Sequence, residues 1–382
     1  MDAPARFARP KRKAEQQGGR GEEADDPRDP DFVPMVEDES DLTAAEKEMN
    51  RRGESIDMSS TDVRVLTSNV AKYAASTDQR TKRQKTEALG EILDATNPTV
   101  AVFQEVTNAP LFGSDLEALP TGKGGQRAFM EGPAYEANTY HESYPYMVDT
   151  ARVHQKPKLS VVDPKTGNRR PYKAPLKFGK KHGGTPRPTT MLELQVQAGR
   201  YPFRPPRKDD MSTGENSATY EESHKNLAHR EPEYAPMSVV NVHTSPSIST
   251  ITEQVKQIRK TMDGLRGDGH NVVAAGDWYM QESAKTQWKE LESSKDWSLA
   301  APAQRTNFPS KGEGQVADMF VVDREKFQSP RATPIAPPQP GASMEDIVAP
   351  KTDAELREWT KRGIDHAPVL LDATLTPSPD DL

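Results

Sequence analysis

Five short stretches of this chain place a side chain that can bind a cation or move a proton at the end of an apolar run or directly beside it. They are Ser68 with Asn69, Gln104 with Glu105, Asn241 with His243, Gly276 with Asp277, and Asp365 with His366. Carboxylate and amide oxygens are ligands for hard divalent cations, and imidazoles titrate near neutral pH. Hydrolysis of a phosphodiester needs both, because it requires an activated water, a cation that offsets phosphoryl charge and help for the leaving oxygen.

Each of these positions also has an ordinary structural interpretation. Polar residues at strand ends commonly form turns or cap loops. Asp365 and His366, in GIDHAPVLL, could simply cap the loop before the last apolar run. Five such positions in chain order, all at the same place relative to a strand, favour one shared sheet edge, where a rigid scaffold carries adaptable groups.

Apolar runs rich in β-branched residues alternate with amphipathic segments along the chain. The runs that indicate strands are 63–68, 99–104, 158–162, 189–196, 237–244, 271–278, 316–323 and 367–375. Residues 79–98 are expected to form a helix that ends at Asn97 and Pro98. In 250–265 apolar residues recur at spacings of four and three, which predicts a second helix with one apolar face. This mixture predicts an α/β (α+β) domain of layered sheets and helices.

Composition separates a domain from polar segments. Of the 382 residues, 33% are apolar, 29% are charged and 33 are proline, which is a small apolar share for a globule of this length. Residues 1–60 carry a basic and then an acidic block, and we expect them to form a disordered tail. Residues 61–376 are expected to form the domain, with polar insertions near 203–236 and 328–350.

Several classes of protein are excluded by composition. The formal net charge of −7 provides no protein-wide basic field, so any site for a polyanion must be local. A chain without cysteine has neither disulfides nor thiolate metal ligands. No apolar run is long enough to cross a bilayer, and the first residues lack the apolar core of a secretory signal. We therefore expect a soluble protein with no signal peptide.

The order of the motifs resembles a known family. TSN, QEV, NVHT, AGDW, ADMFVV and GIDHAPV follow one another between about residues 62 and 375. Together they resemble the endonuclease/exonuclease/phosphatase superfamily, and within it the nuclease subunits of cytolethal distending toxins most of all. Other members are DNase I-like nucleases, apurinic endonucleases, sphingomyelinases and inositol-phosphate phosphatases. The resemblance implies a DNase I-like four-layer sandwich, in which two β-sheets pack face to face with helices outside.

The resemblance also implies roles for single residues. Glu105 matches the principal ligand of Mg²⁺ (or Mn²⁺), with Asn69 and Asp365 as further metal ligands. His366 matches the imidazole that performs general acid and base chemistry at the scissile phosphate. Asp318, in ADMFVV, matches the carboxylate that orients this imidazole and stabilises its charged form.

Further roles concern the phosphate and the water. His243 matches a second histidine, which contacts the phosphate from the other side, and Asp277 matches the carboxylate that positions the attacking water. Arg187 stands where toxin-like members carry a phosphate-contacting arginine. One position departs from the family pattern, because Tyr279 replaces an asparagine whose amide helps to hold the phosphate. A tyrosine hydroxyl can still donate one hydrogen bond, so we predict Tyr279 to bind substrate, with reduced activity or a shifted substrate as the consequence.

These roles predict a Mg²⁺-dependent phosphodiesterase, with a DNA endonuclease preferred and a monomer expected. Two alternatives stay open: a phosphatase or phospholipid phosphodiesterase of the same fold, and a catalytically weakened interaction protein. Basic residues in 173–208 would suit a polyanion, whereas no exposed apolar hairpin indicates an enzyme of membranes. Lys11, Arg12 and Lys13 resemble a short nuclear-import signal, which would suit a secreted effector or toxin that acts in a host cell.

Overall fold

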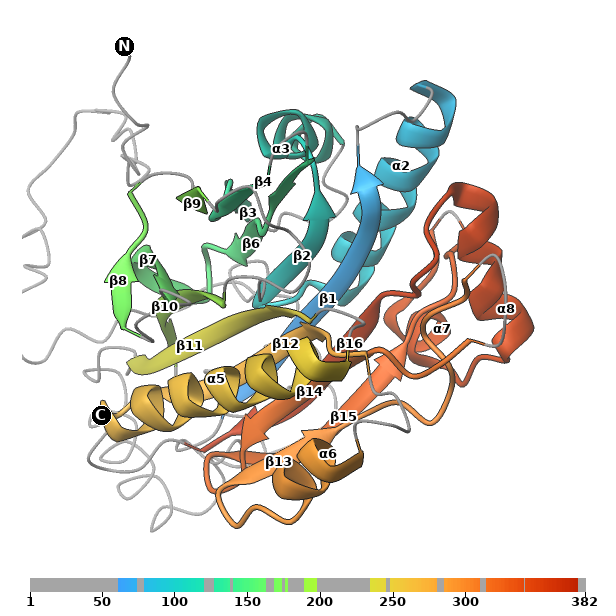
Figure 1. Cartoon of the computed structure of the whole chain (residues 1–382). Coiled ribbons are helices and arrows are strands. Elements are labelled where there is room, and N and C mark those ends of the chain that lie inside the picture. The colour runs from blue at the N-terminus through green and yellow to red at the C-terminus, as the bar shows by residue number, and fades with distance from the viewer. Residues whose placement is uncertain are drawn as a thin grey trace, which may run out of the picture. The chain divides into compact units, whose positions relative to one another are not determined.

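The strands of the computed structural model form two mixed β-sheets (Figure 1). Structure is described for residues 61–73, 79–119, 127–137, 140–162, 168–173, 176–177, 189–197, 234–244, 248–279, 285–309, 314–339 and 341–376. All of them lie in one compact unit, which consists of Glu48–Pro202 and Glu231–Leu382.

The first sheet has nine strands and is centred on β1 (Thr61–Tyr73) and β2 (Val100–Val106), which are parallel. On the far side of β1 lie β16 (Val369–Leu375) and the edge strand β15 (Phe327–Pro334), both in antiparallel pairing. Short strands continue the sheet beyond β2: β3 (Arg127–Met130), β4 (Ala134–Ala137), β5 (Tyr140–Ser143), β6 (Tyr146–Asp149) and β9 (Leu176–Lys177).

The second sheet has seven strands in the order β13-β14-β12-β11-β10-β7-β8. Its centre is the parallel pair β11 (Tyr234–His243) and β12 (Asn271–Asp277). The other strands are β7 (Val153–Val162), β8 (Arg169–Pro171), β10 (Thr190–Gln197), β13 (Trp297–Ala300) and β14 (Asp318–Asp323).

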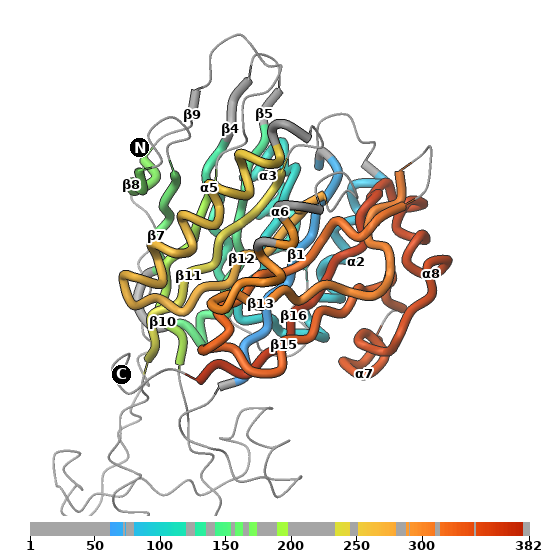
Figure 2. Tube along the Cα trace, turned by 60° about the horizontal axis from the view of Figure 1, so that its bottom comes forward, coloured from blue at the N-terminus to red at the C-terminus, as the bar shows by residue number. Residues whose placement is uncertain are grey.

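Helices cover the outer face of each sheet. Figure 2 shows α5 (Ile248–Gly267) and α6 (Lys285–Glu292) beside β11 and β12, and α2 (Gln79–Thr96) with α7 (Met344–Val348) and α8 (Asp353–Arg357) away from them. The remaining helices in the described residues are α3 (Ala109–Glu117) and the short 3-10 helix η3 (Glu358–Arg362).

Three apolar clusters hold these layers together. Because successive side chains of a strand point to opposite faces, β1 contributes Val63 and Val65 to the cluster between the sheets and Leu66 to the cluster under α2. A third cluster fills the space between α5, α6 and the second sheet. Strands buried on both faces are nearly continuous in apolar residues, which is why the sequence predicts them so clearly. The predicted four-layer sandwich of two packed sheets between helices is confirmed.

One feature of the described residues differs from expectation. The stretch 328–350, expected as a polar insertion, contains most of the edge strand β15 and all of α7. An edge strand needs apolar residues on one face only, so its composition resembles that of a loop. The tail 1–60 lies outside the described residues, as does the insertion 203–236 except for 234–236, which begin β11. No described helix is both long and apolar enough for a bilayer crossing.

A buried polar contact joins the two sheets beneath the edge that carries the candidate site. Gln104 of β2 donates a hydrogen bond of 2.7 Å to Asn241 Oδ1 of β11, and Asn241 Nδ2 donates to Phe103 O at 3.0 Å. Both amides are fully buried. Unsatisfied amides would be costly there, so the contact fixes the two strand ends relative to each other. Glu105 directly follows Gln104 on β2, and His243 lies two residues after Asn241 on β11.

Candidate active site

A buried carboxylate–imidazole pair links the ends of β5 and β11. Glu142 of β5 accepts a hydrogen bond from Nδ1 of His243, and both side chains are inaccessible to solvent. Since a carboxylate only accepts, Nδ1 carries the proton and Nε2 is the atom left for the site. Nε2 is buried, makes no hydrogen bond to the described residues, and lies 3.6 Å from Glu105 Oε1.

A second pair of the same kind joins β14 to the segment before β16. Nδ1 of His366 donates a hydrogen bond of 2.8 Å to Oδ2 of Asp318, with which β14 begins. Burial lowers the pKa of His366, but the carboxylates of Asp318 and Asp277 outweigh this effect and raise the pKa to about 10. The ring is therefore positively charged at neutral pH, and its Nε2 is again the atom that faces the site.

Both imidazoles converge on Asp277, the last residue of β12. Its Oδ2 lies 3.7 Å from Nε2 of His243 and 3.6 Å from Nε2 of His366. Gly276 makes this arrangement possible. Its φ is 148°, and a Cβ at that position would lie only 1.9 Å from Val242 O on the neighbouring strand. The close approach of β12 to β11 thus sets Asp277 level with His243, its partner in the parallel register.

Asn69 holds two of the carboxylates. Its Oδ1 accepts from the backbone N–H of Ala71 at 3.0 Å, which identifies the oxygen, because that backbone group can only donate. Its Nδ2 therefore faces the carboxylates and donates to Glu105 Oε1 at 3.3 Å and to Asp277 Oδ2 at 3.1 Å. Asn69 acts here as a positioning group for both acids. Its predicted part as a metal ligand stays a prediction.

Backbone strain is concentrated at this edge. Among the described residues, five that are not glycine have positive φ, and three of these are Ala71, Glu105 and Tyr279, at 48°, 56° and 45°. The left-handed conformation costs such residues on the order of 1 to 3 kcal/mol each and persists where surrounding structure enforces it. Strain of this kind clusters at functional sites, and here it directs the side chain of Glu105 out of the regular strand pattern.

A buried lysine supplies positive charge next to the acids. Lys85 of α2 is 2% exposed, and its Nζ donates to Val70 O at 3.1 Å and to Ala71 O at 3.3 Å. Burial lowers its pKa to about 8, against the opposing effect of the carboxylates of Asp365 and Glu105. Both carboxylates therefore lie near enough to act on the ammonium group, which places the exposed Asp365 at the same edge.

Two side chains flank the reacting side of His366. Asn307 is buried, and its Nδ2 lies 2.6 Å from Nε2 of the ring. Against a neutral ring the amide donates through N–H, and against a charged ring it accepts through its oxygen after a half-turn of the side chain. Tyr279 meets the ring edge to face, with ring centres 6.0 Å apart and planes at 79°.

The structure brings most of the predicted site residues into one connected cluster. Six are joined by the contacts above: Asn69, Glu105, His243, Asp277, Asp318 and His366. Tyr279 joins them through its ring contact with His366. Asp365 directly precedes His366 in the chain, and its carboxylate acts electrostatically on Lys85 and His366. Arg187 lies outside the described residues, as does most of the basic stretch 173–208.

Three residues of this cluster were not predicted from the sequence. Glu142 lies on a four-residue strand with no apolar pattern that could identify it, Asn307 lies in a loop, and Lys85 lies in a helix rich in lysine and arginine. For Lys85 alone a signal existed: it is four residues before Leu89 and seven before Ile92, on the face that packs against the sheet.

The donor set fits a hard divalent cation. Glu105 and Asp365 are carboxylates that reach solvent, whereas Asp277 next to them is fully buried. In the described part of the chain no group of three or more His, Asp or Glu side chains is placed to hold a metal ion. Mg²⁺ does not need such a group, because it usually keeps several waters and binds one or two carboxylates. Glu105 and Asp365 are the residues that would hold it.

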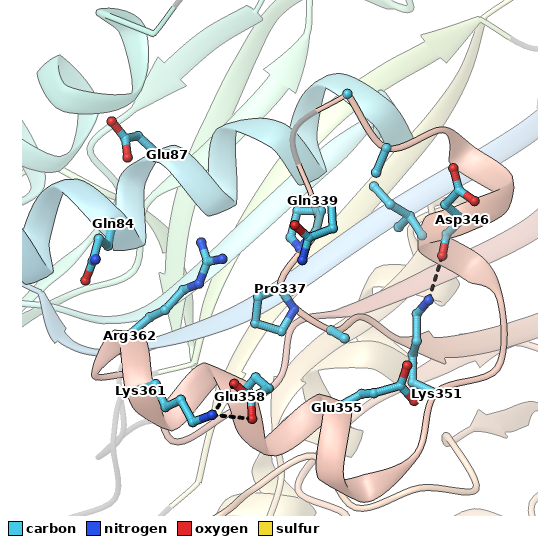
Figure 3. Close-up of a pocket in the computed structure, with 15 residues that line it drawn as sticks. Gln84, Glu87, Pro337, Gln339, Asp346, Lys351, Glu355, Glu358, Lys361 and Arg362 are labelled. Atoms are coloured by element: carbon cyan, nitrogen blue, oxygen red, sulfur yellow. Dashed lines mark hydrogen bonds and ion pairs between the residues drawn. The ribbon is translucent and has the colours of Figure 1, made fainter.

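A groove elsewhere on the molecule is not part of this site. It has a volume of about 950 Å³ and lies between α2, the loop that follows β15, and the α8–η3 segment (Figure 3). Two of its lysines have partners within its lining, because Lys351 donates to the backbone carbonyl of Asp346 at 2.7 Å and Lys361 pairs with Glu358 at 2.6 Å. None of the predicted site residues lines it.

The two packed sheets with helices outside define an α/β sandwich, and one polar edge of it carries the candidate site. No family model matches the sequence, and no curated protein sequence matches it. The structure is similar to an endonuclease/exonuclease/phosphatase from Bacteroides vulgatus, with a TM-score of 0.48 and 12% identity over 82% of this chain and 99% of that one.

Two further solved structures are similar to the chain. One is the human Nocturnin catalytic domain, with a TM-score of 0.46 and 13% identity over 82% of this chain and 95% of that one. The other is TDP2 from D. rerio in complex with a single-strand DNA product, with a TM-score of 0.46 and 12% identity over 82% and 99% of the two chains. Because these TM-scores and identities are low, the fold class of this chain is assigned from its own two sheets and not from the comparison.

Proposed function

We propose that the protein is a Mg²⁺- or Mn²⁺-dependent hydrolase of phosphodiesters, and that DNA cleaved internally is its preferred substrate. The observation that carries the proposal is the convergence of two carboxylate-oriented imidazoles on Asp277 Oδ2, at 3.7 Å and 3.6 Å. Two positioned imidazoles and a carboxylate are what the acid–base part of ester hydrolysis requires. A structural polar core would instead bury its imidazoles without acidic residues at a solvent-accessible edge.

Each residue has a defined task in the proposed reaction. Asp277 positions the attacking water and accepts its proton as the new P–O bond forms. His366, charged and oriented by Asp318, gives the proton on Nε2 to the leaving oxygen as the old P–O bond breaks. His243, oriented by Glu142, directs Nε2 at a phosphoryl oxygen. A divalent cation held by Glu105 and Asp365 would offset the negative charge that grows on the phosphoryl oxygens.

The decisive experiment is cleavage of supercoiled plasmid by purified protein in Mg²⁺, in Mn²⁺ and in EDTA, with phospholipid and inositol-phosphate substrates in parallel. We expect nicking of the plasmid in either metal and none in EDTA. Plasmid that stays intact while a lipid or inositol phosphate is hydrolysed would replace DNA by that substrate. No hydrolysis of any of them would favour the interaction protein, for which the replacement of asparagine by Tyr279 is the supporting observation.

Glu105→Gln separates the metal from the rest of the site. The substitution removes one charge at a partly exposed position (15%) and keeps the shape of the side chain. We expect calorimetry to detect little Mn²⁺ binding and plasmid cleavage to fall together with it, while thermal stability stays close to wild type. Gln328→Glu is the control, at an exposed position at the far end of the β15–β16 pair. It should change neither Mn²⁺ binding nor plasmid cleavage. Unchanged Mn²⁺ affinity in Glu105→Gln would refute the metal assignment.

A further inference from the structure

Asn307 borders the reacting side of His366, and the proposed reaction has not used it. Its side chain is 6% exposed, and its Nδ2 lies 2.6 Å from Nε2 of His366. Nδ1 of the ring is occupied by Asp318 at 2.8 Å. Nε2 is therefore the ring atom that must meet an ester, and any phosphate in reach of Nε2 is also in reach of the amide of Asn307.

The backbone fixes Asn307 to both members of the imidazole pair. Asn307 forms isolated antiparallel bridges with Gln315 on one side and with His366 on the other. Its own N–H donates to Gln315 O at 3.0 Å. The preceding residue, Thr306, accepts through Oγ1 from the backbone N–H of Asp318 at 2.9 Å. A side chain held this firmly beside a reacting atom is preorganised, as substrate-contacting groups must be.

We propose that Asn307 is a substrate-contacting residue, whose side-chain amide donates a hydrogen bond to a non-bridging oxygen of the phosphoester held at His366. The inference rests on the proposed function. The amide nitrogen carries two N–H groups and can serve the ring with at most one of them. At least one donor therefore remains for a phosphoryl oxygen, whichever amide atom faces the ring. Asn307 would thus supply an amide to a site in which Tyr279 stands in place of the expected asparagine.

The competing explanation is that Asn307 only orients the ring. Asn307→Asp and Asn307→Ala distinguish the two roles, because the carboxylate of Asp can still bond Nε2 but repels an anionic phosphate. A ring-orienting role predicts that Asn307→Asp is the more active of the two variants. A phosphate-contacting role predicts the reverse order. Alanine should lose about 10- to 100-fold in kcat/KM, the usual effect of losing one hydrogen bond to a charged group, and Asp should lose at least about tenfold more.

A binding measurement tests the same contact without turnover. Inorganic phosphate in EDTA should raise the Tm of the wild-type protein, because a ligand that binds only the folded state stabilises it. Asn307→Asp should abolish this shift and Asn307→Ala should reduce it, while the control Gln328→Glu, with the same change of charge, should keep it. If Asn307→Asp does not fold, the reduced shift in Asn307→Ala decides the matter.

The outcomes keep the inference apart from the proposed activity. Plasmid cleavage by the wild type together with higher activity of Asn307→Asp than of Asn307→Ala would overturn the inference and leave the activity standing. A phosphate shift that depends on Asn307 in a protein that hydrolyses no ester would support the inference and reject the activity. A wild-type protein whose Tm does not respond to phosphate would overturn the inference whatever it cleaves.

Discussion

His243 and His366 show how one side-chain type is given two environments. Each ring donates Nδ1 to a buried carboxylate, Glu142 in one case and Asp318 in the other, and each directs Nε2 at Asp277. The two rings differ in their other neighbours. Nδ2 of Asn307 lies 2.6 Å from Nε2 of His366. Tyr144 instead meets His243 edge to face, with ring centres 6.2 Å apart.

Asp318 and His366 should behave as a unit. His366→Ala should lower the rate of plasmid cleavage by a factor of about 10² to 10⁴, the usual share of acid–base catalysis. Asp318→Asn should cost somewhat less, since the ring remains but loses its orientation. The double variant should be scarcely slower than His366→Ala, because groups that act together are not additive. Single-turnover cleavage, normalised to the folded fraction, measures all three.

Asp372→Asn is the control for this comparison. Asp372 lies on β16, the strand that follows His366, where it is half exposed and pairs with Arg64 at 3.5 Å. The same chemical change at this position should therefore leave the rate of cleavage unaffected. A rate near that of the wild type for His366→Ala would return Asp365 and His366 to the role of a loop cap.

His270, which lies away from the candidate site, should make the stability of the protein depend on pH. It follows α5, and its Nδ1 lies 2.9 Å from the hydroxyl of Ser238 on β11. Burial lowers its pKa, as do the nearby cations Lys158 and Arg169, and the opposing acids do not restore it. The unfolded chain therefore binds a proton more readily than the folded protein.

The sign of this effect follows from linkage. With a folded pKa below the unfolded value, stability from His270 is fully present above about pH 6.5 and is lost as the pH falls through that value toward the folded pKa. Urea unfolding at pH 7.5 and at pH 5.5 should show a larger loss for the wild type than for His270→Asn. Equal losses in the two proteins would mean that His270 does not contribute to the pH dependence.

At the scale of elements, the approach of β12 to β11 depends on one missing Cβ. In Gly276→Ala the new methyl would meet Val242 O at 1.9 Å, at a φ of 148° that alanine rarely adopts. We expect a loss of about 3 kcal/mol or more in the free energy of unfolding, from overpacking and strain together. Urea denaturation measures it, and activity per folded molecule should fall too, because Asp277 is displaced.

Gly264 provides the matched glycine. It lies in α5, where a Cβ would have nothing within 4 Å. Gly264→Ala should therefore stabilise the protein by roughly 0.5 to 1 kcal/mol, since alanine favours a helix interior. If both substitutions had the same effect, the close contact at Gly276 would not be what sets the position of Asp277.

The elements that the sequence predicts are those whose residues report their own environment. β1, β2, β11, β12, β14 and β16 are buried on both faces and therefore consist of nearly continuous apolar runs, with the polar residue at the end standing out. The short strand that carries Glu142 is defined by its neighbours and has no such signal. Asn307 is placed by bridges to Gln315 and His366, which are contacts across the sequence that no local pattern contains.

At the scale of the whole molecule, charge imposes a condition on the proposed activity. The chain carries a formal net charge of −7, and the edge that carries the candidate site gathers the acids Glu105, Asp277 and Asp365 beside two buried cations, Lys85 and His366. An anionic ester approaching this edge is repelled unless further positive charge is present. A bound divalent cation would weaken this repulsion, so we expect metal to tighten substrate binding and to be required for turnover.

The polar tail should contribute little to the stability of the domain. Residues 1–58 contain few apolar side chains, so they can bury little surface, and β1 begins only at Thr61. A protein that lacks them should keep its Tm to within a few degrees, which corresponds to about 1 kcal/mol for a domain of this size, and should cleave plasmid at the wild-type rate. A chain ended after residue 368 is the contrast, because it loses the buried strand β16 and should not fold. Calorimetry of the two truncated proteins beside the full chain gives the answer. A fall in Tm of ten degrees or more without residues 1–58 would mean that the tail packs on the domain, and the boundary near residue 60 would then be wrong.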